Sequence, residues 1–109
     1  MIGAVSESSR MKKIILMGID PGTLITGYGV IELIDGKFRL ITSDAIVNNS
    51  LKTMANRLET IYNRLSVAIK KFSPDEIAIE TAFYGKNAQS ALKLGQARGV
   101  ALLVAVKNK

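Results

Sequence analysis

The segment IILMGID, residues 14–20, constrains the fold more than any other part of the chain. It is aliphatic except for Gly18 until it reaches Asp20, a pattern typical of a central strand that is covered on both faces. Pro21 and Gly22 follow at once and turn the chain away. We therefore expect a buried strand that holds one carboxylate at a fixed position at its carboxyl end.

Two further strands are predicted directly after this segment. Residues 27–34, GYGVIELI, and residues 38–46, FRLITSDAI, are rich in β-branched and aromatic side chains. Between them, Asp35 and Gly36 tolerate the positive φ angles of a tight hairpin turn. The pattern indicates an antiparallel meander of three strands.

The hydrophobic period changes from Leu51 onward. Apolar residues then recur at intervals of three and four residues as far as Phe72, which predicts an amphipathic helix. Asn49 or Ser50 is expected to cap its amino end, and Pro74 prevents the helix from continuing.

The remainder of the chain predicts one more strand and one more helix. Residues 76–80, EIAIE, form the strand, and the helix is expected from about Ala88 to Val106. Because a helix connects the third and fourth strands, the fourth is expected to lie parallel to an earlier strand, beside residues 14–20. The predicted order is βββαβα, an α/β fold with a mixed sheet and helices packed on it.

The composition suits one compact domain. Of the 109 residues, 48% are hydrophobic, and no linker or low-complexity tract divides them. We expect an unstructured leader or arm over residues 1–10 and one core domain over residues 11–109. No apolar run is long enough to cross a bilayer, and residues 1–10 lack the apolar centre of a secretion signal, so a cytoplasmic protein without membrane contact is expected.

The reactive and charged residues restrict the chemistry. The sequence contains no cysteine and no histidine, which excludes disulfides, zinc sites of the usual kind and histidine acid–base catalysis. Lys and Arg number 15 against 9 Asp and Glu, a net charge of +6 that favours an anionic partner such as a nucleic acid. Many soluble domains carry a similar excess, so charge alone does not identify the partner.

Asp20 and Glu80 are the candidate metal ligands. Both close apolar strands that are expected to be parallel neighbours, so their carboxylates should stand close together at one edge of the sheet. Two close carboxylates repel each other unless one is protonated or both bind a cation, and Mg²⁺ prefers such oxygen ligands. The alternative is structural: an Asp before Pro-Gly often begins a turn, and a Glu at a strand end often meets solvent.

Two longer stretches carry a resemblance to a known family. GIDPGTLITGYGV and PDEIAIETAFYGKNAQSALKLGQARG resemble the RuvC family of Holliday junction resolvases, whose domain has the ribonuclease H-like fold. The likeness extends from about Met11 to Val106, and KNAQSALKLGQARG is its more specific part. The resemblance implies a divalent-metal-dependent endonuclease that resolves four-way DNA junctions in recombination and repair. It also implies a homodimer and a complex with a branch-migration helicase.

The resemblance assigns roles to individual residues. Asp20 and Glu80 match the first two catalytic carboxylates, which in the family bind two Mg²⁺ ions per active site for two-metal phosphodiester hydrolysis. Phe83 matches an aromatic residue that stacks on bases where the junction strands diverge. Tyr84 and Lys86 are expected to contact DNA beside it, since both lie close to Phe83 and to the metal end of the sheet.

The chain departs from the family pattern at its carboxyl end. The family supplies two more acidic ligands from a C-terminal helix, and no such segment follows here. With Asp20 and Glu80 alone, the site is expected to hold magnesium weakly. We therefore expect a ribonuclease H-like core that is incomplete at the C-terminus and, taken by itself, inactive as a nuclease.

Ala91, Gly95 and Gly99 recur at every fourth position of the second predicted helix. Such a stripe lets another backbone come close, although glycine inside a helix is less favourable than alanine by roughly 1 kcal/mol. The stripe either packs on the chain's own sheet or pairs with a second copy across a twofold axis, and the family resemblance favours the dimer interface. Asn87 is expected to cap this helix.

Three other functions are compatible with the pattern. An actin-like ATPase also opens with a strand, an acid and a Gly-Thr turn, but it needs two such domains to enclose a nucleotide. A non-catalytic DNA-binding or dimerisation module of the same fold needs no complete metal site. A ribonuclease H-like nuclease with another substrate is the third, and only the long second motif argues against it.

Overall fold

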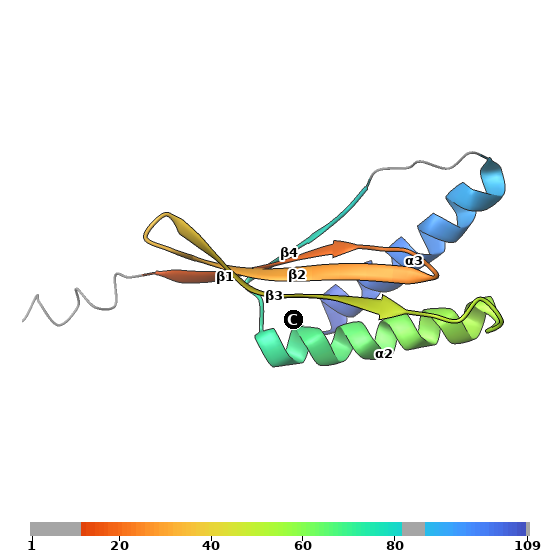
Figure 1. Ribbon diagram of the computed structural model, residues 1–109, viewed down its shortest axis with the longest axis horizontal. Coiled ribbons are helices and arrows are strands. Elements are labelled where there is room, and N and C mark those ends of the chain that lie inside the picture. Colours follow the sequence, from red (N-terminus) through yellow and green to blue (C-terminus); the bar gives the residue numbers. More distant parts are fainter. Residues whose placement is uncertain (1–11, 82–86, 109) are drawn as a thin grey trace, which may run out of the picture.

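The computed structural model describes residues 12–81 and 87–108. Their elements, in chain order, are β1 (Lys13–Asp20), β2 (Ile25–Ile34), β3 (Lys37–Val47), α2 (Met54–Phe72), β4 (Glu76–Ile79) and α3 (Ala88–Lys107) (Figure 1). This order confirms the predicted βββαβα arrangement. The arm expected over residues 1–10 lies outside the described residues.

The strands form one four-stranded mixed sheet in the order β3-β2-β1-β4. β1 pairs antiparallel with β2, and β2 pairs antiparallel with β3, as predicted for a meander. β4 pairs parallel with β1, with Ile79 opposite Ile19. The connection through α2 makes this parallel pairing possible, because a tight turn returns the chain in the opposite direction.

The hairpin between β2 and β3 has the predicted turn. Asp35 and Gly36 adopt φ angles of 51° and 75°, in the left-handed region that Asp and Gly tolerate. Both strands are longer than their sequence patterns suggest, since β2 begins at Ile25 and β3 ends at Val47.

α2 begins later than its hydrophobic period suggests. The expected start at Leu51 and both expected caps are wrong, because α2 starts at Met54 and the Thr53 side chain accepts a hydrogen bond from the Asn56 N–H. Asn49 instead accepts a hydrogen bond from the Leu51 N–H, 2.8 Å long, within a local turn. Leu51 is 90% exposed, so its place in the apolar repeat does not reflect burial.

Both helices pack on one face of the sheet. The core joins Met17 and Ile19 of β1 to buried apolar residues of β2, β3 and the two helices: Val30, Ile46, Ile61, Leu65, Ala68, Ile69, Ala101 and Val104. Side chains alternate along β1, so Gly18 and Asp20 lie on the other face and are exposed. The expectation that β1 is covered on both faces is therefore wrong, since the described residues leave the second face open.

Candidate active site

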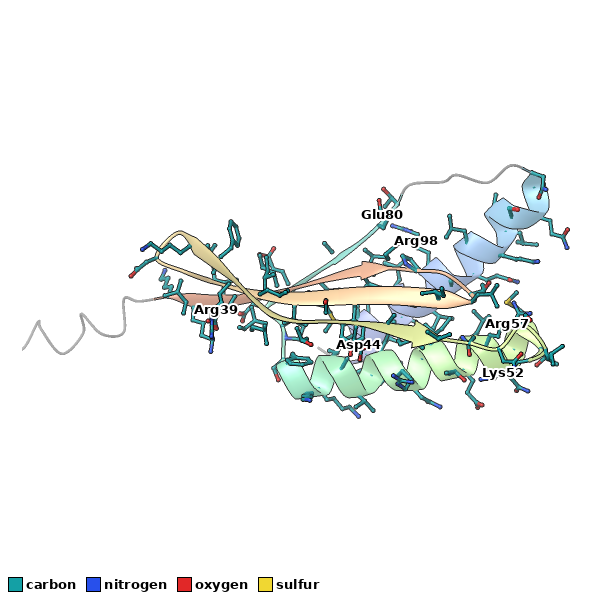
Figure 2. The ribbon with its side chains drawn as sticks, in the orientation of Figure 1. Arg39, Asp44, Lys52, Arg57, Glu80 and Arg98 are labelled. Carbon is teal, nitrogen blue, oxygen red and sulfur yellow. The ribbon has the colours of Figure 1, made fainter. Side chains whose placement is uncertain are left out.

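Asp20 and Glu80 lie at the carboxyl ends of the two parallel strands. Asp20 is the last residue of β1, and Glu80 directly follows β4. The Glu80 N–H donates a 2.9 Å hydrogen bond to the Ile19 carbonyl, so the two strands stay together to their ends. Both acidic residues are exposed, and Figure 2 shows Glu80 where the chain leaves the sheet. Their predicted placement at one edge of the sheet is confirmed, and their chemical role stays a prediction.

A shallow hollow opens on the sheet beside the two acids. It has a volume of about 640 Å³, and both Asp20 and Glu80 border it. Its floor consists of small residues from all four strands: Gly18, Gly27, Gly29, Ser43 and Ala78. Gly18 pairs with Gly29 on one side and with Ala78 on the other, so a row without bulky side chains crosses the sheet. A ligand or a second backbone can approach the sheet closely along this row.

Reasoning from the sequence did not identify these glycines as part of the site. A Cβ placed on Gly18 or Gly27 would meet no atom of residues 12–81 and 87–108 within 4 Å, so packing within these residues does not require glycine at either position. The available signal was their alternation: Gly27 and Gly29 flank Tyr28, which puts both on one face of the strand. Since glycine weakens a strand, this repetition indicates a face that is kept free of side chains.

The donor set suits a hydrated magnesium ion. Asp20 and Glu80 supply carboxylate oxygens, and Mg²⁺ commonly binds through one or two carboxylates while it keeps several waters. Among the described residues, no three acidic or histidine side chains gather at one place. Asp75 lies at the other end of β4, where its carboxylate accepts a hydrogen bond from the Ile15 N–H. Glu59 is exposed on α2. The described residues therefore supply two protein ligands at this edge.

The predicted DNA-contacting residues Phe83, Tyr84 and Lys86 lie outside the described residues. Asn87 follows them and caps α3, as predicted: its side chain accepts a 2.9 Å hydrogen bond from the Ser90 N–H. α3 therefore begins at a defined point just beyond the predicted DNA-contacting segment.

Gly95 and Gly99 lie on the exposed side of α3, and Ala91 is half-buried. Among the described residues, a Cβ at either glycine would meet no atom within 4 Å beyond the neighbouring turns of the helix, so neither glycine packs on the described sheet. Exposed apolar residues share this side of the helix: Leu92, Leu102, Leu103 and Val106. The described chain thus leaves an apolar stripe on α3 uncovered.

Neither α2 nor α3, as described, has the length and apolar content to cross a membrane.

Comparison with known proteins gives a consistent result. The family model described as crossover junction endodeoxyribonuclease RuvC matches residues 16–109. The RuvC of Aeromonas hydrophila is 50% identical over 92 residues, which cover 84% of this chain and 53% of the relative. The RuvC of Syntrophotalea carbinolica is 50% identical over 91 residues, covering 84% of this chain and 56% of the relative. The chain thus spans about half the length of the curated relatives it matches.

Solved structures agree with the sequence comparisons. Thermus thermophilus RuvC in complex with a Holliday junction substrate superimposes with a TM-score of 0.79 at 26% identity, covering 87% of this chain and 61% of that one. A Ppx/GppA phosphatase from Aquifex aeolicus superimposes with a TM-score of 0.56 at 13% identity, over 86% of this chain and 33% of that one. This second likeness concerns the fold alone.

Proposed function

Because the chain belongs to the RuvC family of crossover junction endodeoxyribonucleases, we propose that it carries part of the catalytic site of a Holliday junction resolvase and acts on four-way junction DNA in the cytoplasm. One observation carries this proposal. The parallel pairing of β1 with β4 brings Asp20 and Glu80, the two carboxylates that match the family motif, to the border of one hollow.

Asp20 and Glu80 are the residues that would hold Mg²⁺. When bound, magnesium supplies Lewis acidity toward phosphodiester oxygens and lowers the pKa of water. The protein's contribution is to fix both carboxylates on strand ends, where main-chain hydrogen bonds limit their movement. The glycine floor beside them keeps bulky side chains away from the space that a phosphodiester needs.

Two carboxylates are fewer than the family site employs, and we propose that this chain by itself binds magnesium weakly and does not cut DNA. A resolvase site with two ions needs further acidic ligands, and the described residues gather no third one. A non-catalytic DNA-binding or dimerisation module is the alternative that this shortage favours. Such a module would also bind junction DNA, but it would not hydrolyse a phosphodiester bond.

We propose that the segment between β4 and α3 contacts DNA. Phe83 would stack on unpaired bases, because aromatic side chains bind splayed bases through their faces, and Tyr84 would contact DNA beside it. Lys86 would contact a phosphate, and the net charge of +6 would add a general attraction for DNA. The Thermus RuvC structure named above contains such a junction, which supports the assignment of substrate.

The apolar stripe on α3 is the proposed dimer interface. Gly95 and Gly99 remove bulk from the centre of the stripe, and the exposed leucines around them provide apolar area that a second copy would bury. A homodimer would present two sites to the two symmetric strands of a junction. A branch-migration helicase is a further proposed partner, carried by the family resemblance alone.

A junction-binding and cleavage assay tests the proposed function. Wild type and Asp20→Asn are compared for affinity to a four-way junction and a linear duplex in Ca²⁺, and for cutting in Mg²⁺. We expect preference for the junction and no cutting by either protein. Specific cutting that Asp20→Asn abolishes would show that the chain is a competent nuclease. Equal affinity for the junction and the linear duplex would refute the proposal that four-way junction DNA is the substrate. Thermal stabilisation by a nucleotide would support an actin-like ATPase instead.

A further inference from the structure

The loop over residues 21–24 leaves the sheet directly after Asp20. No hydrogen bond within the described residues holds the Asp20 carboxylate itself, so its position depends on the backbone on either side. β1 fixes the backbone before it through pairing with β2 and β4. The loop must fix the backbone after it, and two residues hold the loop: Thr26 of β2 and Asn48, which follows β3.

Thr26 binds the first part of this loop. Its hydroxyl donates a 2.7 Å hydrogen bond to the Gly22 carbonyl and accepts a 3.2 Å hydrogen bond from the Gly22 N–H. Thr26 is completely buried, so water does not compete for these bonds. Gly22 has no room for a side chain, because a Cβ there would clash with the Ile25 carbonyl oxygen.

Asn48, the residue directly after β3, binds the second part of the loop. Its main-chain N–H donates to the Leu24 carbonyl at 2.7 Å, and its Nδ2 donates to the Thr23 carbonyl at 3.1 Å. The same Nδ2 donates to the carbonyl of Arg57 in α2, at 3.2 Å. Lys52 donates to Asn48 Oδ1 at 3.1 Å, and Figure 2 shows Lys52 and Arg57 near the amino end of α2. Asn48 therefore ties the loop to the helical layer.

We propose that Thr26 and Asn48 are positioning residues that hold the Asp20 carboxylate ready for a divalent cation. Partners that orient a ligand from behind govern cation affinity even though they do not touch the ion. This inference rests on the proposed metal role of Asp20 and Glu80, and it adds residues that do not line the hollow. The hydroxyl of Thr26 is the essential group, since it alone binds both the N–H and the carbonyl of Gly22.

Mn²⁺ titration followed by NMR tests the inference on the intact chain. Paramagnetic broadening of the Asp20 and Glu80 amide signals gives the Mn²⁺ affinity, and ¹⁵N relaxation gives the mobility of residues 21–24. Thr26→Val keeps the shape and removes the hydroxyl, so affinity should fall roughly 10-fold and the loop should become mobile. Thr26→Ser retains the hydroxyl and should restore both. Thr42→Val, on β3, is the matched control and should change neither.

Each outcome decides the inference. Unchanged Mn²⁺ affinity in Thr26→Val, or no recovery in Thr26→Ser, would overturn it, even if thermal stability falls. If Thr26→Val does not fold, Asn48→Ala removes the donor to Thr23 without adding a charge and should weaken Mn²⁺ binding in the same way; unchanged affinity there would also overturn the inference. Asp20→Asn distinguishes a failure of the proposed metal site from a failure of the inference about Thr26 and Asn48. If wild type and Asp20→Asn respond equally to Mn²⁺, the proposed metal site is wrong and the inference falls with it.

Discussion

Gly18 and Gly29 lie directly opposite each other across β1 and β2, in the floor of the hollow that Asp20 and Glu80 border. Glycine in a strand interior loses more backbone entropy on folding than alanine does. A Cβ on Gly18 would meet no atom of the described residues within 4 Å. Packing within the described chain therefore gives no reason for glycine, rather than alanine, at this position.

Gly18→Ala should raise the free energy of unfolding by about 0.5–1 kcal/mol, because it removes backbone entropy from the unfolded chain without a steric clash in the strand. Urea unfolding followed by circular dichroism measures the change. A lower midpoint in the variant would show that the open space above Gly18 is occupied in solution.

Gly22→Ala should have the opposite effect. Its Cβ would clash with the Ile25 carbonyl oxygen, a main-chain atom that cannot move without opening the loop. We expect the free energy of unfolding to fall by about 1–3 kcal/mol, as in other overpacked sites. The same urea titration measures it, with Gly18→Ala as the matched control. A variant as stable as wild type would contradict the tight loop geometry.

The Glu32 carboxylate makes the stability of the folded chain depend on pH. Its side chain is buried, accepts a 2.5 Å hydrogen bond from Arg39 Nε and lies 3.4 Å from Lys13 Nζ. The hydrogen bond from Arg39 is the main cause that lowers the pKa of Glu32, and it outweighs the opposing effect of burial. A carboxyl with a lowered pKa in the folded state stabilises the fold above its ordinary pKa, about 4.3. This stability is lost as pH falls through the lower folded value.

Glu32→Gln should remove that part of the pH dependence. Urea midpoints measured from pH 7 down to pH 2.5 should fall below about pH 4.3 in wild type, and this fall should be smaller in the variant. At pH 7 the variant should unfold at a lower urea concentration. Glu59→Gln, on the exposed side of α2, is the control and should follow wild type. Parallel curves for wild type and Glu32→Gln would refute the role of this carboxylate.

Gly95→Leu should prevent the proposed dimer. The part of the chain that the structure describes leaves space for the new side chain, since a Cβ at Gly95 would meet none of its atoms within 4 Å, so the monomer should fold normally. A second copy packed against the stripe would clash with it. Sedimentation velocity should show a dimer for wild type and a monomer for Gly95→Leu, while Val67→Leu on α2 should remain dimeric. Dimers in all three would place the interface elsewhere.

Lys86→Ala should weaken binding to a four-way junction and reduce its dependence on salt. A lysine that neutralises one phosphate releases about one counterion, so the slope of log affinity against log salt should become smaller by about 1. Fluorescence anisotropy at several salt concentrations measures the slope. Lys37→Ala, at the hairpin far from Glu80 along the sheet, serves as the control. An unchanged slope in Lys86→Ala would show that this lysine touches no phosphate.

The boundaries of α2 show where reading the sequence fails. The apolar repeat begins at Leu51, yet the helix starts at Met54, because Asn49 forms a local turn and Thr53 provides the cap. Several residues in this region have side chains suited to capping, and their order does not say which one bonds to a helical N–H. The hydrogen bonds of the folded chain decide between them.

The sequence by itself determined the elements, their order, the hairpin turn and the two acids at strand ends. These features follow from local periodicity, turn chemistry and the rule that a helical crossover makes neighbouring strands parallel. Only the tertiary structure decided the open face of the sheet, the glycine floor and the support of the loop after Asp20. Those features depend on contacts between distant segments, such as Asn48 with Thr23 and Asp75 with Ile15. Such contacts leave no periodic signal in the chain, because they arise only when the layers pack together.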